Sequence, residues 1–406
     1  SVLRALDMGP ETIVGQIRPV ITSAEINRAK HAKKSFAAAW DNQFGSWEYQ
    51  AVMNEEKGTE IIVDWADNTS VRMSAKQLYD VVFDGKNKWM LSANGTIFTY
   101  EHEAIIPGLL KRWYSERQEM QRKMHECGDN EIEREYWDKR QLVKKINLNS
   151  LYGAILNPGC RFFDIRIGQS VTLTGRCITK HMGAKVNEII AGKYDHKGES
   201  VVYGDTDSVY FSAHKTLSKE ITAGQIPWTK DSVVELYDKI AEEVNTSFTN
   251  FMTKAFHCPS TRGSVIKAGR ELVASKGLFI TKKRYAVLYY DVEGERVDVA
   301  GKPGKMKAMG LDLKRSDTPV FVQDFLSEIL MMVLQGKDEQ EVLERISSFR
   351  EEFKSRPGWE KGSPKRANNM TKYTAAEEKA GRANMPGHVR ASMNWNRCRE
   401  MYGDKY

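Results

Sequence analysis

The chain has 406 residues, of which 41% are hydrophobic and 28% charged, and its formal net charge is +7. This composition is typical of a globular protein with two or three domains, and the mild positive charge is compatible with a polyanionic partner. There is no run of 18 apolar residues and no C-x-x-C pair among the five cysteines, so we expect a cytoplasmic protein without a membrane span, zinc site or disulfide framework.

The first part of the chain, to about residue 104, has the pattern of a mixed α/β region. Runs rich in β-branched and aromatic residues predict strands at 59–65, 89–91 and 97–100. Residues 93–96 (Ala-Asn-Gly-Thr) lie between the last two runs and have a hairpin turn signal.

Two long helices are expected next. Pro107 is tolerated in the first turn of a helix that runs to about residue 126. Residues 127–130 (Cys-Gly-Asp-Asn) interrupt it, and a second helix is expected over 131–152, ended by Gly153. Long helices joined by so short a turn form an antiparallel hairpin.

A β-hairpin is predicted further along the chain. Residues 201–204 and 208–211 are β-rich runs that flank a tight turn, which places Asp205, Thr206 and Asp207 at or near its tip. The other expected elements are helices at 170–191, 232–256, 318–334 and 339–353 and a strand at 284–290.

Asp205 and Asp207 are the first candidates for chemistry. In an extended segment, residues two apart point the same way, so the two carboxylates would share one face. They would repel each other unless a cation lay between them, and Mg²⁺ binds carboxylates together with water and phosphate oxygens. A bare D-x-D is more often an ordinary polar turn. The apolar strands on both sides and Gly204 favour a metal site for phosphoryl transfer.

The helical hairpin offers a second candidate site. Facing residues in such a hairpin have a nearly constant sum of positions, which predicts the pairs Arg117–Lys145, Gln121–Gln141 and Trp113–Asn149. Arg117 and Lys145 would then converge on a triphosphate. The alternative is a solvated charge pattern, because the hairpin holds many other charged residues. A solvated face could equally explain the basic residues between 354 and 372.

Three motifs resemble those of family B (alpha-like) DNA polymerases, in that family's order and spacing. They are Lys145–Gly153 (K-x-x-x-N-S-x-Y-G), Tyr203–Ser208 (Y-G-D-T-D-S) and Lys282–Tyr285 (K-K-R-Y). The likeness extends over the whole chain, and residues 1–13, 305–310 and 362–366 resemble the tailed-phage branch.

The resemblance implies an α+β protein with the right-hand architecture of a polymerase. It divides the chain into palm (1–104), a helical fingers hairpin (105–157), palm with the catalytic hairpin (158–315) and an incomplete thumb (316–406). The implied activity is template-directed DNA synthesis, which adds dNTPs to a primer 3′ end by two-metal phosphoryl transfer.

The resemblance also assigns roles to single residues. Asp207 would bridge two Mg²⁺ ions, for which Mn²⁺ could substitute, with Asp205 a weaker contributor and Glu271 loosely aligned with an acid near the metals. The dNTP site would comprise Lys145, also a catalytic residue, with Arg117, Gln121, Asn149, Tyr152 and Gly153. Gln121 stands where the phage branch often has a basic residue. Primer-template DNA would be held by Lys282, Lys283, Arg284 and Tyr285 and by the thumb residues Lys365, Arg366, Asn368 and Asn369.

The chain departs from the family pattern at its two ends. Of the first catalytic motif, D-x-x-S-L-Y-P-S, only the last serine could remain, as Ser1. We therefore expect little activity from the isolated chain and a partner segment that carries this motif and the exonuclease, in a split enzyme or a longer protein. A sliding clamp would bind through a carboxyl-terminal tail that is not in this sequence. The alternatives are a non-catalytic DNA-binding half of a split polymerase and an unrelated Mg²⁺ phosphotransferase.

Overall fold

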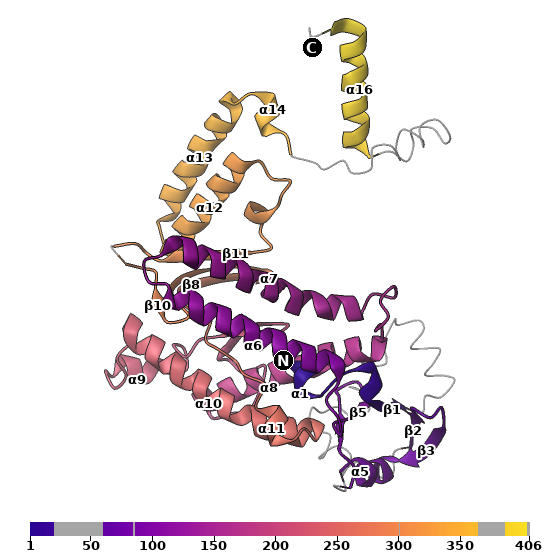
Figure 1. Ribbon diagram of the computed structural model, residues 1–406. Helices are drawn as coiled ribbons and strands as arrows, with labels where there is room; N and C mark the ends of the chain where they lie inside the picture. Colours follow the sequence, from indigo (N-terminus) through magenta and orange to yellow (C-terminus); the bar gives the residue numbers. More distant parts are fainter. Residues whose placement is uncertain (20–59, 84–85, 300, 364–385, 404–406) are drawn as a thin grey trace. The chain divides into compact units, whose positions relative to one another are not determined.

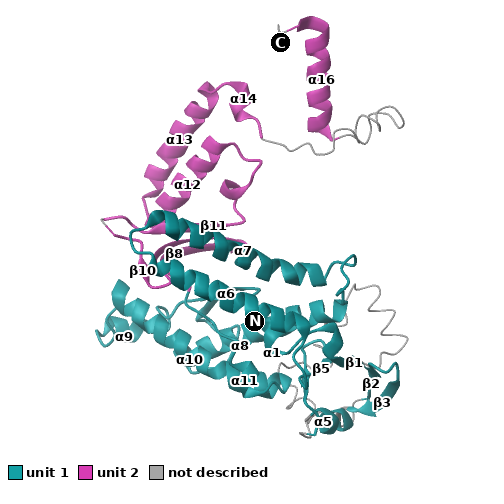
Figure 2. Ribbon diagram, viewed as in Figure 1, with its two compact units in different colours: residues 1–270 teal, residues 271–406 magenta. Residues whose placement is uncertain are grey.

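The computed structural model describes residues 1–19, 60–83, 86–299, 301–363 and 386–403 (Figure 1). The chain divides into two compact units, which are Ser1–Arg270 and Glu271–Tyr406 (Figure 2). Within the described ranges, none of the helices combines the length and the apolar composition needed to cross a bilayer. The mixture of helices and antiparallel strands confirms the predicted α+β class.

An antiparallel sheet forms one side of the core of the first unit. Its strand order is β3-β2-β1-β5-β4. The strands are β1 (Ile13–Pro19), β2 (Glu60–Trp65), β3 (Ser70–Ser74), β4 (Trp89–Leu91) and β5 (Thr96–Thr99), and helix α5 (Ala75–Phe83) follows β3. The predictions of β2, β4 and β5 are confirmed. Alternate residues Ile61 and Val63 of β2 are fully buried, as expected for a sheet with one face on the core.

The turn between β4 and β5 is buried, although its sequence is polar. Ser92 and Asn94 are almost inaccessible to solvent. Helix α8 (Ile165–Ala191) supplies their partners: Ser170 Oγ donates to Asn94 Oδ1 at 2.6 Å, and Thr174 Oγ1 accepts from Ala93 N at 3.1 Å. Because buried polar groups need such partners, this turn fixes the sheet against α8.

Long helices complete the first unit, and side-chain caps set where they begin. They are α6 (Ile105–Glu126), α7 (Glu131–Ile155), α8 and α10 (Lys230–Phe256), with the short helices α1 (Val2–Ala5), α9 (Ser218–Thr222) and α11 (Ser260–Gly263). Asn130 caps α7, Asp164 caps α8 and Thr229 caps α10, each by accepting from a backbone N–H in the first turn. Phe248, Phe256 and other apolar residues of α10 are buried in the same core as the sheet.

Helix α7 continues past the end that the sequence predicted. Gly153 lies inside the helix, which ends at Ile155. A glycine costs a helix about 1 kcal/mol. Ile155 is buried in the core and Leu151 packs against it, so burial of this last turn outweighs the propensity of one residue.

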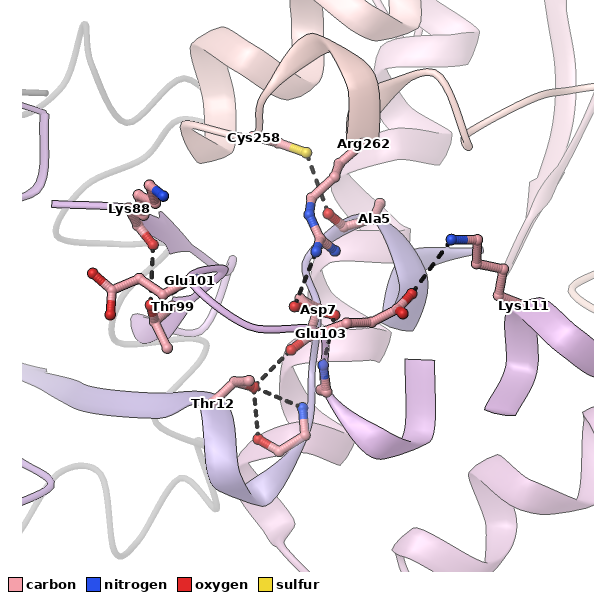
Figure 3. A network of polar contacts seen from close by, with 12 residues as sticks. Ala5, Asp7, Thr12, Lys88, Thr99, Glu101, Glu103, Lys111, Cys258 and Arg262 are labelled. Carbon is pink, nitrogen blue, oxygen red and sulfur yellow. Dashed lines mark hydrogen bonds and ion pairs between the residues drawn. The ribbon is translucent and has the colours of Figure 1, made fainter. Parts of the chain in front are cut away.

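A polar network holds the first residues of the chain in place (Figure 3). Asp7 is fully buried, and its Oδ2 lies 3.1 Å from the guanidinium of Arg262 on α11. Ala104 N donates to Asp7 Oδ1 at 3.3 Å, just before α6 begins, and the Cys258 thiol donates to Ala5 O at 3.3 Å. Burial raises the pKa of Asp7, and the charge of Arg262 opposes that rise only in part. The network ties α1 to α11 and to the start of α6.

The second unit combines a sheet with a helical hairpin. Its strands are β8 (Leu272–Thr281), β9 (Arg284–Val292), β10 (Glu295–Arg296) and β11 (Lys305–Met309), and its helices are α12 (Val320–Gln335), α13 (Glu339–Ser355), α14 (Gly358–Lys361) and α16 (Gly387–Tyr402). Ala286, Leu288 and Ala308 of the sheet form a buried cluster with Leu334 of α12. Phe325 and Phe349 stack at 3.6 Å between ring centroids and join α12 to α13.

The division between the two units falls between Arg270 and Glu271. It lies inside the segment 158–315 that was predicted as the second part of the palm. The sheet with the K-K-R-Y element therefore shares its core with α12. The palm, fingers and thumb boundaries stay predictions.

Candidate functional site

The predicted acidic hairpin is present in the first unit. Strands β6 (Val201–Asp205) and β7 (Ser208–Phe211) pair in antiparallel fashion, with Asp205 opposite Ser208. Thr206 and Asp207 form the two-residue loop between them. The Asp205 side chain is half-buried and Asp207 is exposed, so the tip presents carboxylates on a short rigid hairpin.

The conformation at the tip differs from the one assumed in the sequence argument. Thr206 has a φ of 47°, which lies in the left-handed region, so the segment from Asp205 to Asp207 is not extended. The expectation that Asp205 and Asp207 share one face of a strand is therefore wrong in its reasoning. A two-residue hairpin loop requires positive φ at its first position, where glycine is the usual residue. The turn, and not the pleat of a strand, directs the two carboxylates.

Hydroxyl groups fix this turn. Thr179 Oγ1 on α8 donates to Thr206 O at 2.7 Å. Thr206 Oγ1 lies 3.1 Å from Asp205 Oδ1, and Ser208 Oγ donates to Asp205 O at 3.2 Å. No motif or pattern pointed to Thr179, which lies 27 residues before Thr206 in the chain.

The residues predicted as metal ligands meet the chemical requirement only in part. Carboxylates at a hairpin tip, one half-buried and one exposed, suit a hard divalent ion, which takes one or two of them and completes its shell with water and phosphate. The described part of the chain, however, contains no cluster of three or more His, Cys, Asp or Glu side chains that could hold a metal ion. Glu271, in the second unit, accepts from Lys307 Nζ at 2.6 Å, so its carboxylate has a cationic partner.

The predicted antiparallel pairing of the two long helices is confirmed, but in another register. Arg117 Nε donates to Gln141 Oε1 at 3.1 Å, where the sequence argument placed Gln121 opposite Gln141. Lys144 pairs with Glu116 across the same interface. The facing positions are thus shifted by two to four residues, or about half to one helical turn. Side-chain packing between the helices sets this register, and a constant-sum rule cannot supply its offset.

Lys145 remains open to a ligand in this register. Its side chain is exposed and has no hydrogen bond or ion pair among the described residues. Asn149 and Gly153 are exposed further along α7, and a Cβ at Gly153 would meet nothing within 4 Å. Tyr152 donates from its hydroxyl to Gly168 O at 3.3 Å, and burial raises the pKa of its phenol. Gln121 is half-buried on α6.

The K-K-R-Y element forms the turn between β8 and β9. Thr281 pairs with Arg284, so Lys282 and Lys283 are the two loop residues, and Lys283 has a φ of 63°. A Cβ at Gly310 would lie 2.0 Å from Lys283 O, so only glycine allows this approach. Lys282, Lys283 and Arg284 are exposed. Tyr285 is only 8% exposed and stacks on Phe279 at 5.5 Å between centroids, so its side chain supports the hairpin from inside.

Further cations lie on β11 beside this element. Lys305 is exposed and Lys307 half-buried, while Met306 and Ala308 between and after them pack on the helical side of the sheet. The two-residue alternation K-M-K-A is the signal that could have found them. The predicted thumb contacts Lys365, Arg366, Asn368 and Asn369 lie outside the described residues.

Comparison with known proteins agrees with these motifs. The sequence model of DNA polymerase family B matches residues 60–357. The chain is 31% identical over 269 residues to the DNA-directed DNA polymerase of Escherichia phage RB69, and 28% identical over 272 residues to that of Enterobacteria phage T4. Each alignment covers 64% of this chain and 29% of the relative. The DNA polymerase delta catalytic subunit of Oryza sativa subsp. japonica is 28% identical over 238 residues, 58% of this chain and 18% of the relative. The chain thus spans less than a third of the length of these relatives, and it belongs to DNA polymerase family B.

Proposed function

We propose that this chain carries the nucleotidyl-transfer site of a template-directed DNA polymerase, which adds dNTPs to a primer 3′ end. The carboxylate-bearing hairpin Tyr203–Ser208, placed within a match to DNA polymerase family B, is the observation that supports this proposal. The phage relatives are named DNA-directed DNA polymerases. The right-hand division into palm, fingers and thumb belongs to the same proposal.

Asp205 and Asp207 would hold the metal ions. Polymerases of this family use divalent metals, and we propose two Mg²⁺ ions, which Mn²⁺ can replace. Bound there, such ions stabilise the attacking and leaving oxygens of phosphoryl transfer. The chain's own contribution is rigidity, because a short hairpin supported by α8 keeps the two carboxylates oriented before substrate arrives. Glu271 is a further candidate ligand, and it would have to exchange its contact with Lys307.

The dNTP would bind along the α6–α7 hairpin. Lys145 is exposed, and its ammonium could bind the triphosphate as a point charge. Arg117 is hydrogen-bonded to Gln141, which lies one helical turn before Lys145 on α7. Its remaining N–H groups could donate to phosphate oxygens. Gln121 could add a neutral hydrogen bond. Asn149, Tyr152 and Gly153 would line the pocket of the new base pair.

The primer-template duplex would bind to the second unit. Lys282, Lys283 and Arg284 project from one turn, and such cations contact phosphates without reading sequence. Tyr285 would act through packing under that turn. The thumb residues, Lys365, Arg366, Asn368 and Asn369, would add phosphate contacts.

We propose that the chain works together with the rest of a family B polymerase, which carries the exonuclease and the first catalytic motif. This chain together with that remaining sequence is called the assembled enzyme below. A sliding clamp is a proposed further partner. Synthesis would take place in the bacterial cytoplasm if a phage encodes the gene.

The test is primer extension by the assembled enzyme carrying Asp207→Asn. Replacing the charge should lower the rate of extension about 100-fold or more, since it removes stabilisation that is specific to the transition state. Primer-template affinity should change little, because an ionised carboxylate has no hydrogen-bond donor to offer a phosphate. If extension persists at the wild-type rate, Asp207 is not a metal ligand. A chain that binds DNA but supports no metal-dependent step in any assembly would instead be the non-catalytic half of a split polymerase.

A further inference from the structure

The loop at the hairpin tip is strained. Thr206 has a φ of 47°, and a β-branched side chain is disfavoured in the left-handed region that glycine or asparagine adopts readily. Such a conformation persists only where the surrounding structure holds it, and it is found at sites that must be preorganised. The residue that holds Thr206 therefore controls the backbone between the two carboxylates.

The hydroxyl of Thr179 is that support. It donates to Thr206 O at 2.7 Å, from a different secondary-structure element. Thr206 O belongs to the peptide group that leads directly into Asp207, so the contact fixes the rotation of this peptide. The side-chain contact of Thr206 with Asp205 Oδ1, at 3.1 Å, depends on the same backbone conformation. One hydrogen bond thus constrains the loop on both sides.

The helix that carries Thr179 is a rigid anchor. Helix α8 spans 27 residues, has an Asp164 cap at its start and ends at Gly192 in the left-handed conformation. One residue before Thr179, Ile178 is buried in the core, and two residues after it the buried His181 is hydrogen-bonded at both ring nitrogens. Movement of Thr179 relative to the core would break these contacts.

We propose that Thr179 is a positioning residue for the metal carboxylates: its hydroxyl holds the Thr206 peptide so that Asp205 and Asp207 keep one orientation. The inference rests on the proposed function, because it assumes that these carboxylates bind metal. Without the hydroxyl, the loop would exchange among conformations, and only a fraction of molecules would present both carboxylates correctly. The apparent metal affinity falls by that fraction.

An ordinary helical role for Thr179 makes a different prediction. Its hydroxyl also lies 3.0 Å from Gly175 O, one turn earlier on α8, and threonines commonly make this contact within a helix. If that were its purpose, Thr179→Val would preserve shape and helix and leave metal binding unchanged. If the hydroxyl holds the loop, Val removes the support, while Thr179→Ser retains a donor and restores most of the affinity.

The experiment measures two quantities on the assembled enzyme. One is the dependence of single-turnover primer extension on Mg²⁺ concentration, and the other is Mn²⁺ binding followed by electron paramagnetic resonance in the absence of dNTP. We expect Thr179→Val to raise the half-saturating metal concentration about tenfold in both, the effect of losing about one hydrogen bond. The KM for dNTP should stay unchanged, because the proposed dNTP contacts lie on α6 and α7.

A matched control isolates the contact with the loop. Thr246→Val makes the same substitution on α10, where the hydroxyl donates to Glu243 O of its own helix at 2.7 Å, and it should leave both metal curves unchanged. Wild-type metal curves for Thr179→Val would overturn the proposal, as would a failure of Thr179→Ser to restore affinity. Asp207→Asn separates the two hypotheses: if it leaves metal binding intact, the proposed function fails, whereas loss in Asp207→Asn with no change in Thr179→Val refutes only the role of Thr179.

Discussion

His181 is a buried neutral imidazole, and the stability of the first unit should depend on pH because of it. Its side chain is 6% exposed. Nδ1 lies 2.7 Å from the Tyr194 hydroxyl, Nε2 lies 2.9 Å from Ser247 Oγ, and the ring stacks on Phe251 with centroids 4.0 Å apart. The ring links α8 to α10 and to the segment that follows α8.

The hydrogen bonds around His181 favour one neutral tautomer. Ser247 donates its single proton to Val244 O at 2.6 Å, so its oxygen accepts from Nε2–H. Nδ1 is then the acceptor for the hydroxyl of Tyr194. A second proton, on Nδ1, would face that hydroxyl hydrogen, and the tyrosine would have to turn its O–H away. Protonation of Nδ1 therefore costs the hydrogen bond that Tyr194 donates to it.

The magnitude follows from the pKa. Burial, helped by the positive charge of Lys185, lowers the pKa of His181 from 6.5 to about 4. Between these values the unfolded chain binds more protons than the native protein, so stability is full above pH 6.5 and falls as the pH drops toward 4. At 1.36 kcal/mol per unit, the loss reaches roughly 3 kcal/mol across the window and about 2 kcal/mol by pH 5.

Urea unfolding followed by circular dichroism at pH 7 and pH 5 measures this effect. His181→Gln should have a lower free energy of unfolding than the wild type at pH 7. Between pH 7 and pH 5, however, its free energy of unfolding should fall by about 2 kcal/mol less than that of the wild type, because glutamine does not titrate. His125→Gln, at an exposed position on α6, should follow the wild-type pH dependence. Equal losses in the wild type and in His181→Gln would refute the reasoning.

Other perturbations test the polar network and the second unit. Arg262→Met should cost about 3 kcal/mol by thermal unfolding, since it leaves the charge of the buried Asp7 unpaired, and part of this loss should be recovered at low pH as Asp7 protonates. Gly310→Ala should weaken primer-template binding, because its Cβ would collide with Lys283 O and displace the turn. Lys282→Ala should weaken that binding equally for all sequences and reduce the slope of log affinity against log salt by about 1.

Each of these predictions has a matched control. Arg72→Met breaks the exposed pair with Glu60 and should change stability by less than about 1 kcal/mol. Gly301 also has a positive φ, but a Cβ added there would contact nothing within 4 Å. Gly301→Ala should therefore leave DNA binding unchanged. Lys337→Ala removes an exposed lysine that pairs with Glu341 on α13, and an effect on the salt slope as large as that of Lys282→Ala would contradict the proposed duplex contact.

Local chemistry made several features predictable from the sequence. The acidic hairpin joins residues that are near neighbours in the chain, so strand propensity and a two-residue loop suffice to place Asp205 and Asp207 at its tip. The same holds for the long helices α6 and α7, because the sequence has no proline or glycine at 109–126 or at 131–152, on the two sides of the short turn at 127–130. Two of the family motifs lie within these elements and the third forms the turn between β8 and β9. Each is a short continuous segment, so family membership also followed from the sequence.

Only the tertiary structure decided how these elements fit together. The α6–α7 register, which pairs Arg117 with Gln141, depends on side-chain packing between helices. The contact of Thr179 with Thr206 depends on α8 lying beside a hairpin that comes later in the chain. Burial of Ile155 carried α7 past Gly153. In each case the deciding free energy comes from contacts between residues that are distant in sequence. The sequence alone therefore located the two carboxylates, whereas the packing of α8 against the hairpin determined the backbone conformation that orients them.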